Sequence, residues 1–449
     1  MADFLSSLQK SSLTQRFQSG VSWSFSGKII SAAAALATNA LLARLLSPEE
    51  MGTYFLAFSL VAVLAISGQW GMNRGLVKLI ASELANGHSA LARNGIIASF
   101  IVVASISLFI VLFLISPAGG WTLTAISGSN LLVSISLFMG LWLLIKAMQG
   151  LVSESFRGFH DIRLATLFGG LMTAVLSMLF FLAFWLFYGH ATLEQVVTLT
   201  VLAAGISLLT GLVFIFHKLQ TLDRGGNIAI SRILRFGFPL FLTSMTLFGV
   251  KEFHIWVLAM FQPESEVALY GSAVRLVILL EMPLIIVNSV IPPIIAELYS
   301  QGKYQQVQRV LQKTATLVSI PAFFVFCLIL LFGGEVLGVT YGASYKEAYI
   351  PFVILAVGQF VNVLTGSPGI LLTMSGHEGV VMKSALGSGI IGVASSFILV
   401  PEFGAIGAAV GYSVGVMLVN VTMWTYSHRR LAIFTHGSPM VIKEILLNR

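Results

Sequence analysis

Charged side chains stand inside the long apolar runs of this 449-residue sequence. Lys28 lies in the first such run, Lys251 and Glu252 in a later one, and Arg275 and Glu281 in the run that follows. In hydrocarbon such a group costs about 2.5–3.5 kcal/mol unless it faces protein or water. We therefore expect a path for a charged substrate, with structural ion pairs or snorkelling to the interface as the alternatives.

Spacing indicates which of these side chains share a helix face. Arg275 and Glu281 are six residues apart, about 120° around a helix, so each needs a partner elsewhere. His254 follows Lys251 at helical spacing and shares its face. The expected wall is polar and net positive, which suits an anionic substrate. The candidate substrate-binding residues are Lys28, Asn39, Lys251, His254 and Arg275, with Glu252 and Glu281 as supporting acids.

Motifs that would indicate an enzyme are absent from the sequence. "GSGIIG" (387–392) matches a dinucleotide-binding pattern, but it lies in an apolar run without a preceding strand, so close helix packing is the better interpretation. The same holds for the GxxxG spacings in "GAIGAAVGYSVG" (404–415). Cys327 is the only cysteine and lies in an apolar run. We expect no catalytic residues, no metal and no cofactor.

The composition identifies the solvent of this chain. Hydrophobic residues make up 57% of it, charged residues only 10%, and the mean hydropathy is +0.93. Soluble domains carry about 25% charged residues. The chain is therefore expected to be an all-α integral membrane protein, because helices satisfy their own backbone in hydrocarbon. The opening "MADFLSSLQKSSLTQRFQSG" is polar and has no apolar core ending in a small-residue cleavage site, so we expect no cleaved signal peptide.

Twelve apolar runs are long enough to cross a bilayer. They are residues 20–43, 51–72, 95–115, 123–147, 165–187, 193–216, 236–260, 269–291, 314–333, 350–372, 381–400 and 404–426. With a cytoplasmic N-terminus, the odd-numbered loops hold only two basic residues, Arg44 and Lys346, of the 25 in the chain. Because cytoplasmic loops are enriched in Lys and Arg, both termini are expected in the cytoplasm. Contact with anionic lipids then accounts for the net charge of +7 without nucleic acid.

The two halves of the chain resemble each other. "SPEEMGTYFLAFSL" (47–60) resembles "QPESEVALYGSAVRL" (262–276), and "FRGFHDIRLAT" (156–166) resembles "MSGHEGVVMKS" (374–384). We expect two six-helix bundles, residues 1–216 and 233–449, joined by a cytoplasmic linker, residues 217–232. Parallel repeats of this kind surround a substrate path. The segments after spans 2 and 8 are amphipathic and are expected to lie along the cytoplasmic interface.

Three segments resemble polysaccharide flippases of the Wzx type, in the multidrug/oligosaccharidyl-lipid/polysaccharide exporter superfamily. They are "LLARLLSPEEMGTYFLAFSLVAVLAISGQWGMNRGLVKLIA" (41–81), "VALYGSAVRL" (267–276) and "PEFGAIGAAVGY" (401–412). The resemblance implies two helical bundles around a central, often cationic cavity. It also implies transport of a polyprenyl-pyrophosphate-linked oligosaccharide from the cytoplasmic to the outer leaflet of the bacterial inner membrane. Polysaccharide polymerase and assembly proteins would be partners.

By position in this resemblance, the basic residue of the "YGSAVRL" segment is Arg275. Where relatives often have an acid in span 7, this sequence presents His254, with Glu252 two residues earlier. That departure places a proton- or cation-coupling role for the position in doubt.

Other functions remain open at this point. A drug/cation antiporter of the same fold needs buried acids, whereas basic groups outnumber acids at depth here. A peptidoglycan-precursor flippase usually has two further spans. A membrane polysaccharide polymerase or ligase, an enzyme, typically carries a long external loop, whereas the longest odd-numbered loop here is residues 333–348.

Overall fold

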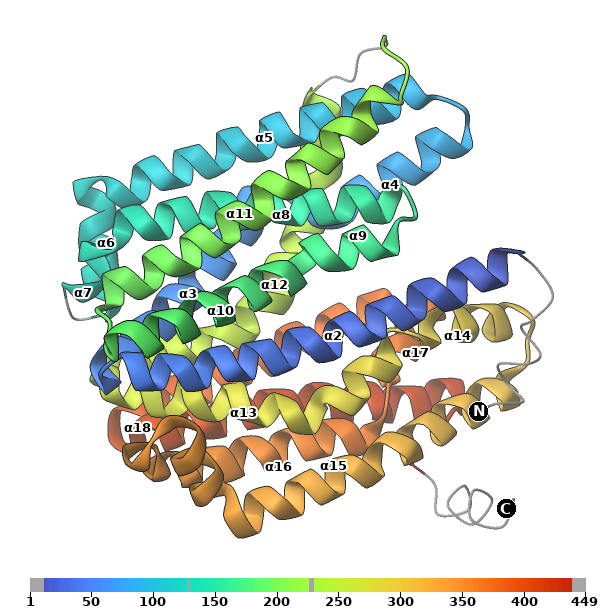
Figure 1. Cartoon of the computed structure of the whole chain (residues 1–449). Coiled ribbons are helices and arrows are strands. Elements are labelled where there is room, and N and C mark those ends of the chain that lie inside the picture. The colour runs from blue at the N-terminus through green and yellow to red at the C-terminus, as the bar shows by residue number, and fades with distance from the viewer. Residues whose placement is uncertain (1–11, 128–129, 226–229, 438–449) are drawn as a thin grey trace. The chain divides into compact units, whose positions relative to one another are not determined.

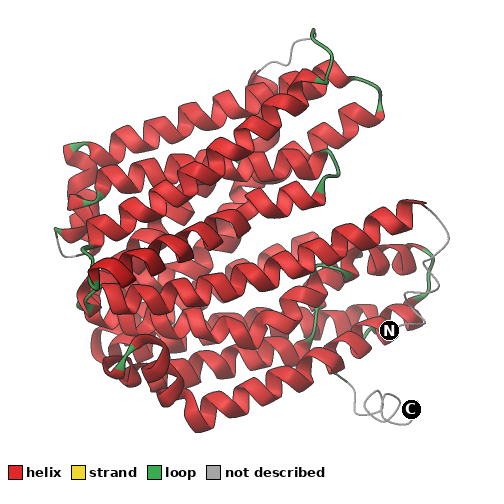
Figure 2. Ribbon diagram, in the orientation of Figure 1, coloured by secondary structure: helices red, strands yellow, loops and turns green. Residues whose placement is uncertain are grey.

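The computed structural model describes residues 12–127, 130–225 and 230–437, and within them it is almost entirely helical (Figure 1). Figure 2 shows helices joined by short loops, with no strand among these residues. This agrees with the expectation from hydropathy, because a helix pairs its backbone polar groups internally.

Contacts between residues divide the chain into two compact units. Unit 1 comprises the described parts of Met1–Leu46, Ala57–Thr124 and Ser129–Met245, and unit 2 comprises those of Ser47–Leu56, Ala125–Gly128 and Thr246–Arg449. The predicted boundary, residues 217–232, stays a prediction.

The helices numbered up to α11 lie mainly in unit 1. They are α2 (Ser12–Leu45), α3 (Pro48–Gln69), α4 (Met72–Ala85), α5 (Ser89–Ile115), α6 (Pro117–Ser127), α7 (Leu131–Ser134), α8 (Ser136–Gly158), α9 (Ile162–Thr166), the π-helical turn η1 (Leu167–Leu171), α10 (Met172–Tyr188) and α11 (Leu193–Gln220). Local signals mark several of their starts. Thr192 and Gln195 form a capping box that opens α11, and the Asp161 carboxylate accepts the Leu164 amide at the start of α9.

The later helices lie mainly in unit 2. They are α12 (Ile230–Phe261), α13 (Glu264–Asn288), α14 (Ile291–Ser300), α15 (Tyr304–Tyr341), the 3₁₀ turn η2 (Ala343–Ala348), α16 (Tyr349–Thr365), α17 (Pro368–Met374) and α18 (Glu378–Leu431). Helix α18 is interrupted at Gly404, whose φ of 50° and ψ of −128° are not helical. Gly404 therefore divides α18 at the boundary between two predicted spans.

The first four helices of the two halves follow the same order of long and short elements. The short helix α4 separates α3 from α5, and the short helix α14 separates α13 from α15. These two short helices lie in the segments that the sequence predicts to be amphipathic. Their place along the membrane interface, and the superposition of the two halves, stay predictions.

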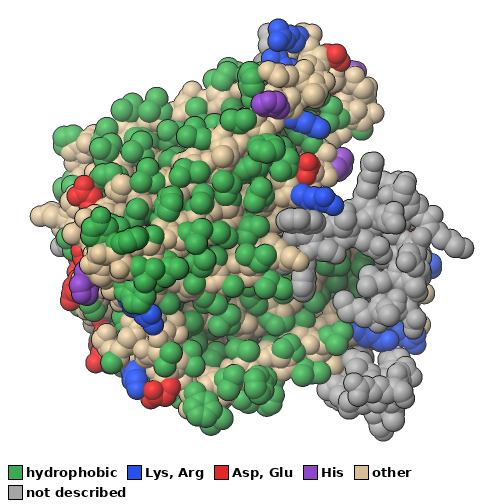
Figure 3. Space-filling view, in the orientation of Figure 1, with side chains coloured by type: hydrophobic (Ala, Val, Ile, Leu, Met, Phe, Trp, Pro, Cys, Tyr) green, Lys and Arg blue, Asp and Glu red, His purple; other side chains and the backbone are tan. Residues whose placement is uncertain are grey.

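Apolar side chains cover the outside of the helices as well as the core. On the face shown in Figure 3, hydrophobic side chains coat the helices, and charged side chains gather near the helix ends. Phe109, Phe187 and Leu331 are more than 70% exposed. The core of unit 1 includes Leu76 and Phe156, which are almost fully buried. Apolar surface on both sides of a helix is expected where lipid is the solvent.

Ten helical segments are long and apolar enough to cross a membrane among the described residues. The chain is thus a multi-pass membrane protein of approximately the predicted span number. Helix α18 counts once in that number although Gly404 divides it, and α12 covers predicted span 7 without being among the ten. The exact number of twelve crossings stays a prediction.

Two predicted spans differ from the structure. Span 4, expected at 123–147, is α8, Ser136–Gly158, and α6 is a separate helix before it. The prediction ended the span near Lys146, but this lysine is accommodated inside α8 by an aromatic partner, so the helix continues. Span 10, expected as one run at 350–372, ends at Thr365 and resumes as α17 at Pro368. Gly366 (φ 75°) and the proline interrupt it.

Candidate functional site

Unit 2 contains a lysine that interacts electrostatically with two carboxylates. Electrostatic interactions join Lys251 of α12 to Glu252, to Glu281 of α13 and to Tyr412 of α18. Tyr270 of α13 interacts with Tyr412 and Glu252. We call these five residues the mixed-charge cluster. Three helices contribute to it, so its assembly depends on how α12, α13 and α18 pack.

Exposure differs within the mixed-charge cluster. Lys251 is exposed, Glu252 and Glu281 are half-buried, and Tyr270 and Tyr412 are 2% and 8% exposed. The two tyrosines therefore form its buried floor and the charged groups its accessible side. An ammonium near two carboxylates is stabilised by them, and an incoming anion can compete with them for it.

Polar hydrogen bonds continue from this floor into α16. Gln359, which is 2% exposed, donates its side-chain amide to the Tyr412 hydroxyl at 2.9 Å. Asn362, one turn further along, donates to the Gln359 amide oxygen at 2.9 Å. The side-chain amides of Gln359 and Asn362 thus both donate to protein acceptors, and such pairing is the condition for tolerating polar groups in a membrane protein core.

His254 has a different environment from Lys251, although the two are three residues apart. Its ring is 2% exposed, its Nδ1 lies 2.8 Å from the Ser396 hydroxyl, and its centroid is 5.6 Å from that of Tyr412. Ser396 is itself fully buried, in α18. The structure therefore places His254 between α12 and α18 as a packing residue.

Arg275 contacts another set of side chains. Its guanidinium carbon lies 5.5 Å from the centroid of the Phe55 ring, at a distance typical of a cation–π contact. It also interacts electrostatically with Tyr341 of α15. Arg275 is half-buried. An aromatic partner restrains the plane of the guanidinium.

Lys28 and Asn39 lie on α2 in unit 1. Lys28 is half-buried and interacts electrostatically with Arg157, near the end of α8. Asn39 donates its side-chain amide to the Ala35 carbonyl at 2.7 Å, a bond within its own helix. The two side chains therefore have different partners, Arg157 for Lys28 and the backbone of its own helix for Asn39.

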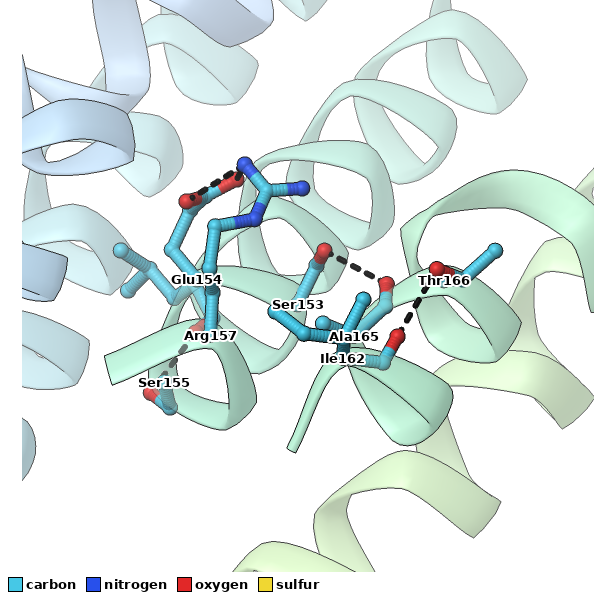
Figure 4. Close-up of polar contacts among 8 residues, drawn as sticks. Ser153, Glu154, Ser155, Arg157, Ile162, Ala165 and Thr166 are labelled. Atoms are coloured by element: carbon cyan, nitrogen blue, oxygen red, sulfur yellow. Dashed lines mark hydrogen bonds and ion pairs between the residues drawn. The ribbon is translucent and has the colours of Figure 1, made fainter. Parts of the chain in front are cut away.

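Figure 4 shows the ion pair that Arg157 forms with Glu154. Arg157 Nη1 donates to both Glu154 carboxylate oxygens, at 2.8 and 3.0 Å. Nearby, Ser153 donates to the Ala165 carbonyl at 2.9 Å and joins α8 to α9. The ion pair half-neutralises a site that otherwise carries two cations, Lys28 and Arg157.

Sequence reasoning missed three charged residues of α8, namely Lys146, Glu154 and Arg157, because it ended the span too early. Lys146 Nζ lies 4.3 Å from the centroid of the Phe58 ring of α3. A signal was present: the run from Ser136 to Arg157 contains no proline and only two glycines. An uninterrupted helix was therefore the simpler prediction.

No group of three or more His, Cys, Asp or Glu side chains suited to a metal ion occurs among the described residues. In unit 2, the candidate cations Lys251 and Arg275 lie within predicted spans and have carboxylate, tyrosine or phenylalanine neighbours. Cations with such neighbours are chemically suited to reversible binding of an anion.

Solved structures of membrane transporters share this fold. The inward-facing conformation of a multidrug resistance MATE family transporter of the MOP superfamily matches with a TM-score of 0.76 at 18% identity, over 90% of this chain and 94% of that one. A MOP superfamily transporter from Pyrococcus furiosus matches with a TM-score of 0.64 at 17% identity, over 95% and 98%. The fold is therefore that of MOP-superfamily membrane transporters.

Within this class, the chain belongs to the polysaccharide biosynthesis protein family, whose model matches residues 17–299. It is 25% identical to a probable low-salt glycan biosynthesis flippase of Haloferax volcanii, over 82% of this chain and 74% of the relative. It is 21% identical to a putative O-antigen transporter of Shigella flexneri, over 90% and 96%. These relatives indicate a transporter rather than an enzyme.

Proposed function

We propose that this protein is a flippase that moves a polyprenyl-pyrophosphate-linked oligosaccharide from the cytoplasmic to the outer leaflet for polysaccharide biosynthesis. Family membership and the two relatives support the class of substrate. The observation that carries the proposal is the pair of cations within the spans of unit 2: Lys251 interacts with two carboxylates, and Arg275 lies beside an aromatic ring. A pyrophosphate is the anionic group that such a lipid-linked sugar presents.

In this proposal Arg275, Lys251 and Lys28 attract the pyrophosphate. The planar donors of a guanidinium match phosphate oxygens in a bidentate arrangement, and Phe55 restrains that plane. Glu252 and Glu281 stabilise Lys251 while the site is empty and compete with the pyrophosphate afterwards. Release needs such competition, since a carrier that binds too tightly does not turn over. His254 and Asn39 have no direct role here, because their polar groups bond within the protein.

Transport proceeds by alternating access in this proposal, with the repeat halves 1–216 and 233–449 as the moving parts and 217–232 as their link. The protein resides in the bacterial inner membrane, and polysaccharide polymerase and assembly proteins receive its product. Both termini are cytoplasmic, as the basic residues of the even-numbered loops support. A reporter fused after Arg449 is expected to read as cytoplasmic, and a periplasmic reading would contradict this topology.

The decisive experiment is complementation of a strain that lacks its own flippase. Arg275→Gln keeps a polar side chain but removes the charge and the bidentate donors, so it is expected to abolish complementation at normal membrane levels. Arg275→Lys keeps the charge alone and is expected to be partly active. Arg309→Gln, outside the predicted spans, is the matched control and is expected to complement fully. Normal transport by Arg275→Gln would show that the proposal is wrong.

A drug/cation antiporter is the second candidate, because the structural neighbours include a multidrug resistance transporter. Antiport requires a carboxylate that is free to take up a proton or cation, whereas Glu252 and Glu281 both lie near Lys251. Drug resistance conferred by the expressed protein, lost in Glu281→Gln and unaffected in Arg275→Gln, would favour this candidate.

A further inference from the structure

A pocket of about 300 Å³ lies within unit 2, beside the interruption between α16 and α17. Its polar lining includes three carboxamides, Asn288 of α13, Asn362 of α16 and Asn420 of α18, together with Ser367 and Thr373. Its apolar lining includes the side chains of Met374, Val381 and Met423. The volume is at the lower end of ligand pockets, about 300–1,000 Å³, and suits one sugar ring rather than a drug-sized molecule.

The three carboxamides are oriented by bonds to protein atoms. Asn420 donates to the Val416 carbonyl at 2.9 Å, and Asn362 donates to Gln359 at 2.9 Å. The Asn288 oxygen accepts a hydrogen bond from the Ser367 hydroxyl at 2.5 Å. These bonds use the amide nitrogens of Asn362 and Asn420 and the amide oxygen of Asn288.

The opposite end of each carboxamide remains for a ligand. Within the described residues, no hydrogen bond is made by the amide oxygens of Asn362 and Asn420 or by the amide nitrogen of Asn288. These three atoms are not among the fully buried polar atoms without a hydrogen-bond partner, so each of the three atoms keeps accessible surface. The pocket therefore offers two fixed acceptors and one fixed donor, the complement of sugar hydroxyl and acetamido groups.

Charge defines the class of ligand. The described lining contains no Lys, Arg, Asp or Glu. An ionised ligand would have no counter-charge in the pocket and would lose its hydration there. An uncharged sugar ring would place its hydroxyl groups on the carboxamides and its C–H face on the methionines.

The pocket occurs where the repeat is broken. The match of residues 374–384 with residues 156–166 places Gly366 opposite Met148, which is inside the continuous helix α8. At Gly366 the corresponding helix stops, with φ at 75°. Interrupted helices in transporters are tolerated where they line a cavity and often form the substrate site.

We propose that this pocket is a sugar subsite, which binds an uncharged sugar ring, of the N-acetylhexosamine class, in the lipid-linked substrate. The inference rests on the proposed function for the identity of the whole substrate, but the pocket and its chemistry are independent of Arg275. The hydrogen-bonded chain from Tyr412 through Gln359 to Asn362 connects the subsite to the mixed-charge cluster. In this proposal, different residues bind the sugar and the pyrophosphate.

The test compares two probes on the purified full chain in detergent, undecaprenyl pyrophosphate with and without one N-acetylglucosamine. Dissociation constants are measured by microscale thermophoresis. Asn420→Leu keeps the number and branching of the side-chain heavy atoms and removes the acceptor, and is expected to weaken binding of the glycosylated probe about fivefold, as for one hydrogen bond. Binding of the bare probe is expected to stay unchanged. Thr425→Val, on the same helix and outside the pocket lining, is the control and should change neither.

The subsite would be overturned if Asn420→Leu, at wild-type thermal stability, weakened the binding of both probes equally or left the binding of both unchanged. If the wild type binds neither probe, the proposed function fails. Saturation-transfer NMR with millimolar methyl N-acetylglucosaminide then tests whether the pocket binds a sugar. Sugar binding that is lost in Asn420→Leu supports the subsite, and no binding overturns it. Methyl glucuronide should bind more weakly, and equal binding would contradict the uncharged class.

Discussion

Replacement of His254 by Leu is expected to destabilise unit 2 without acting on the substrate directly. The imidazole is the hydrogen-bond partner of the Ser396 hydroxyl, which is fully buried. A buried polar group that loses its partner costs about 1–3 kcal/mol. The edge contact of the ring with Tyr412 contributes about 0.5–1.5 kcal/mol more. The expected loss in the free energy of unfolding is therefore about 3 kcal/mol.

Thermal unfolding in detergent measures this effect. For a unit of 150–250 residues, 1 kcal/mol corresponds to about 2–4 °C, so Tm is expected to fall by about 6–12 °C in His254→Leu. The double variant His254→Leu/Ser396→Ala removes the unpaired hydroxyl and is expected to recover a third or more of this loss. Such recovery would identify the buried hydroxyl as the cause.

Two outcomes would refute the reasoning. The first is equal stability of the single and double variants, because the unpaired hydroxyl would then cost nothing. The second is loss of transport at an unchanged Tm, because His254 would then act on the substrate, as its position in the sequence first indicated.

Two further predictions concern the segments around the pocket. Gly366→Ala is expected to lower Tm more than Gly376→Ala: both glycines have positive φ, but only at Gly366 would a Cβ meet the Thr435 carbonyl and Ala315, and equal effects would exclude this crowding. Burial, and secondly the charge of His428, lower the pKa of His436, whose Nδ1 accepts a hydrogen bond from Trp424. Because the unfolded chain binds this proton more readily, stability is expected to fall as pH drops below about 6.5, and His436→Gln should lose less Tm than wild type between pH 7.5 and pH 5.5.

The membrane class of this protein and most of its helices follow from the sequence alone. Hydropathy and helix propensity are local properties, so runs such as residues 193–216 and 236–260 could be identified without knowledge of their neighbours. The charged residues within these runs are visible for the same reason. The family resemblance was also carried by contiguous segments, and the family model confirms it.

Tertiary structure alone decided which side chains meet. Lys251, Glu281 and Tyr412 are far apart in the chain and come together because α12, α13 and α18 pack against one another. The same packing buries His254 while it leaves Lys251 exposed, although their spacing predicted a shared environment.

The helix limits that were predicted wrongly have the same origin. A lysine normally ends an apolar run, but Lys146 remains inside α8 because Phe58 of another helix lies 4.3 Å away. The motif "TGSPG" (365–369) indicates a helix break in span 10. The pocket at this break, however, is formed only because α13 and α18 pack there and contribute Asn288 and Asn420. The local sequence determines the hydropathy and helix propensity of each segment. The energy of a buried charge or of a helix interruption depends instead on partners that only the tertiary structure supplies.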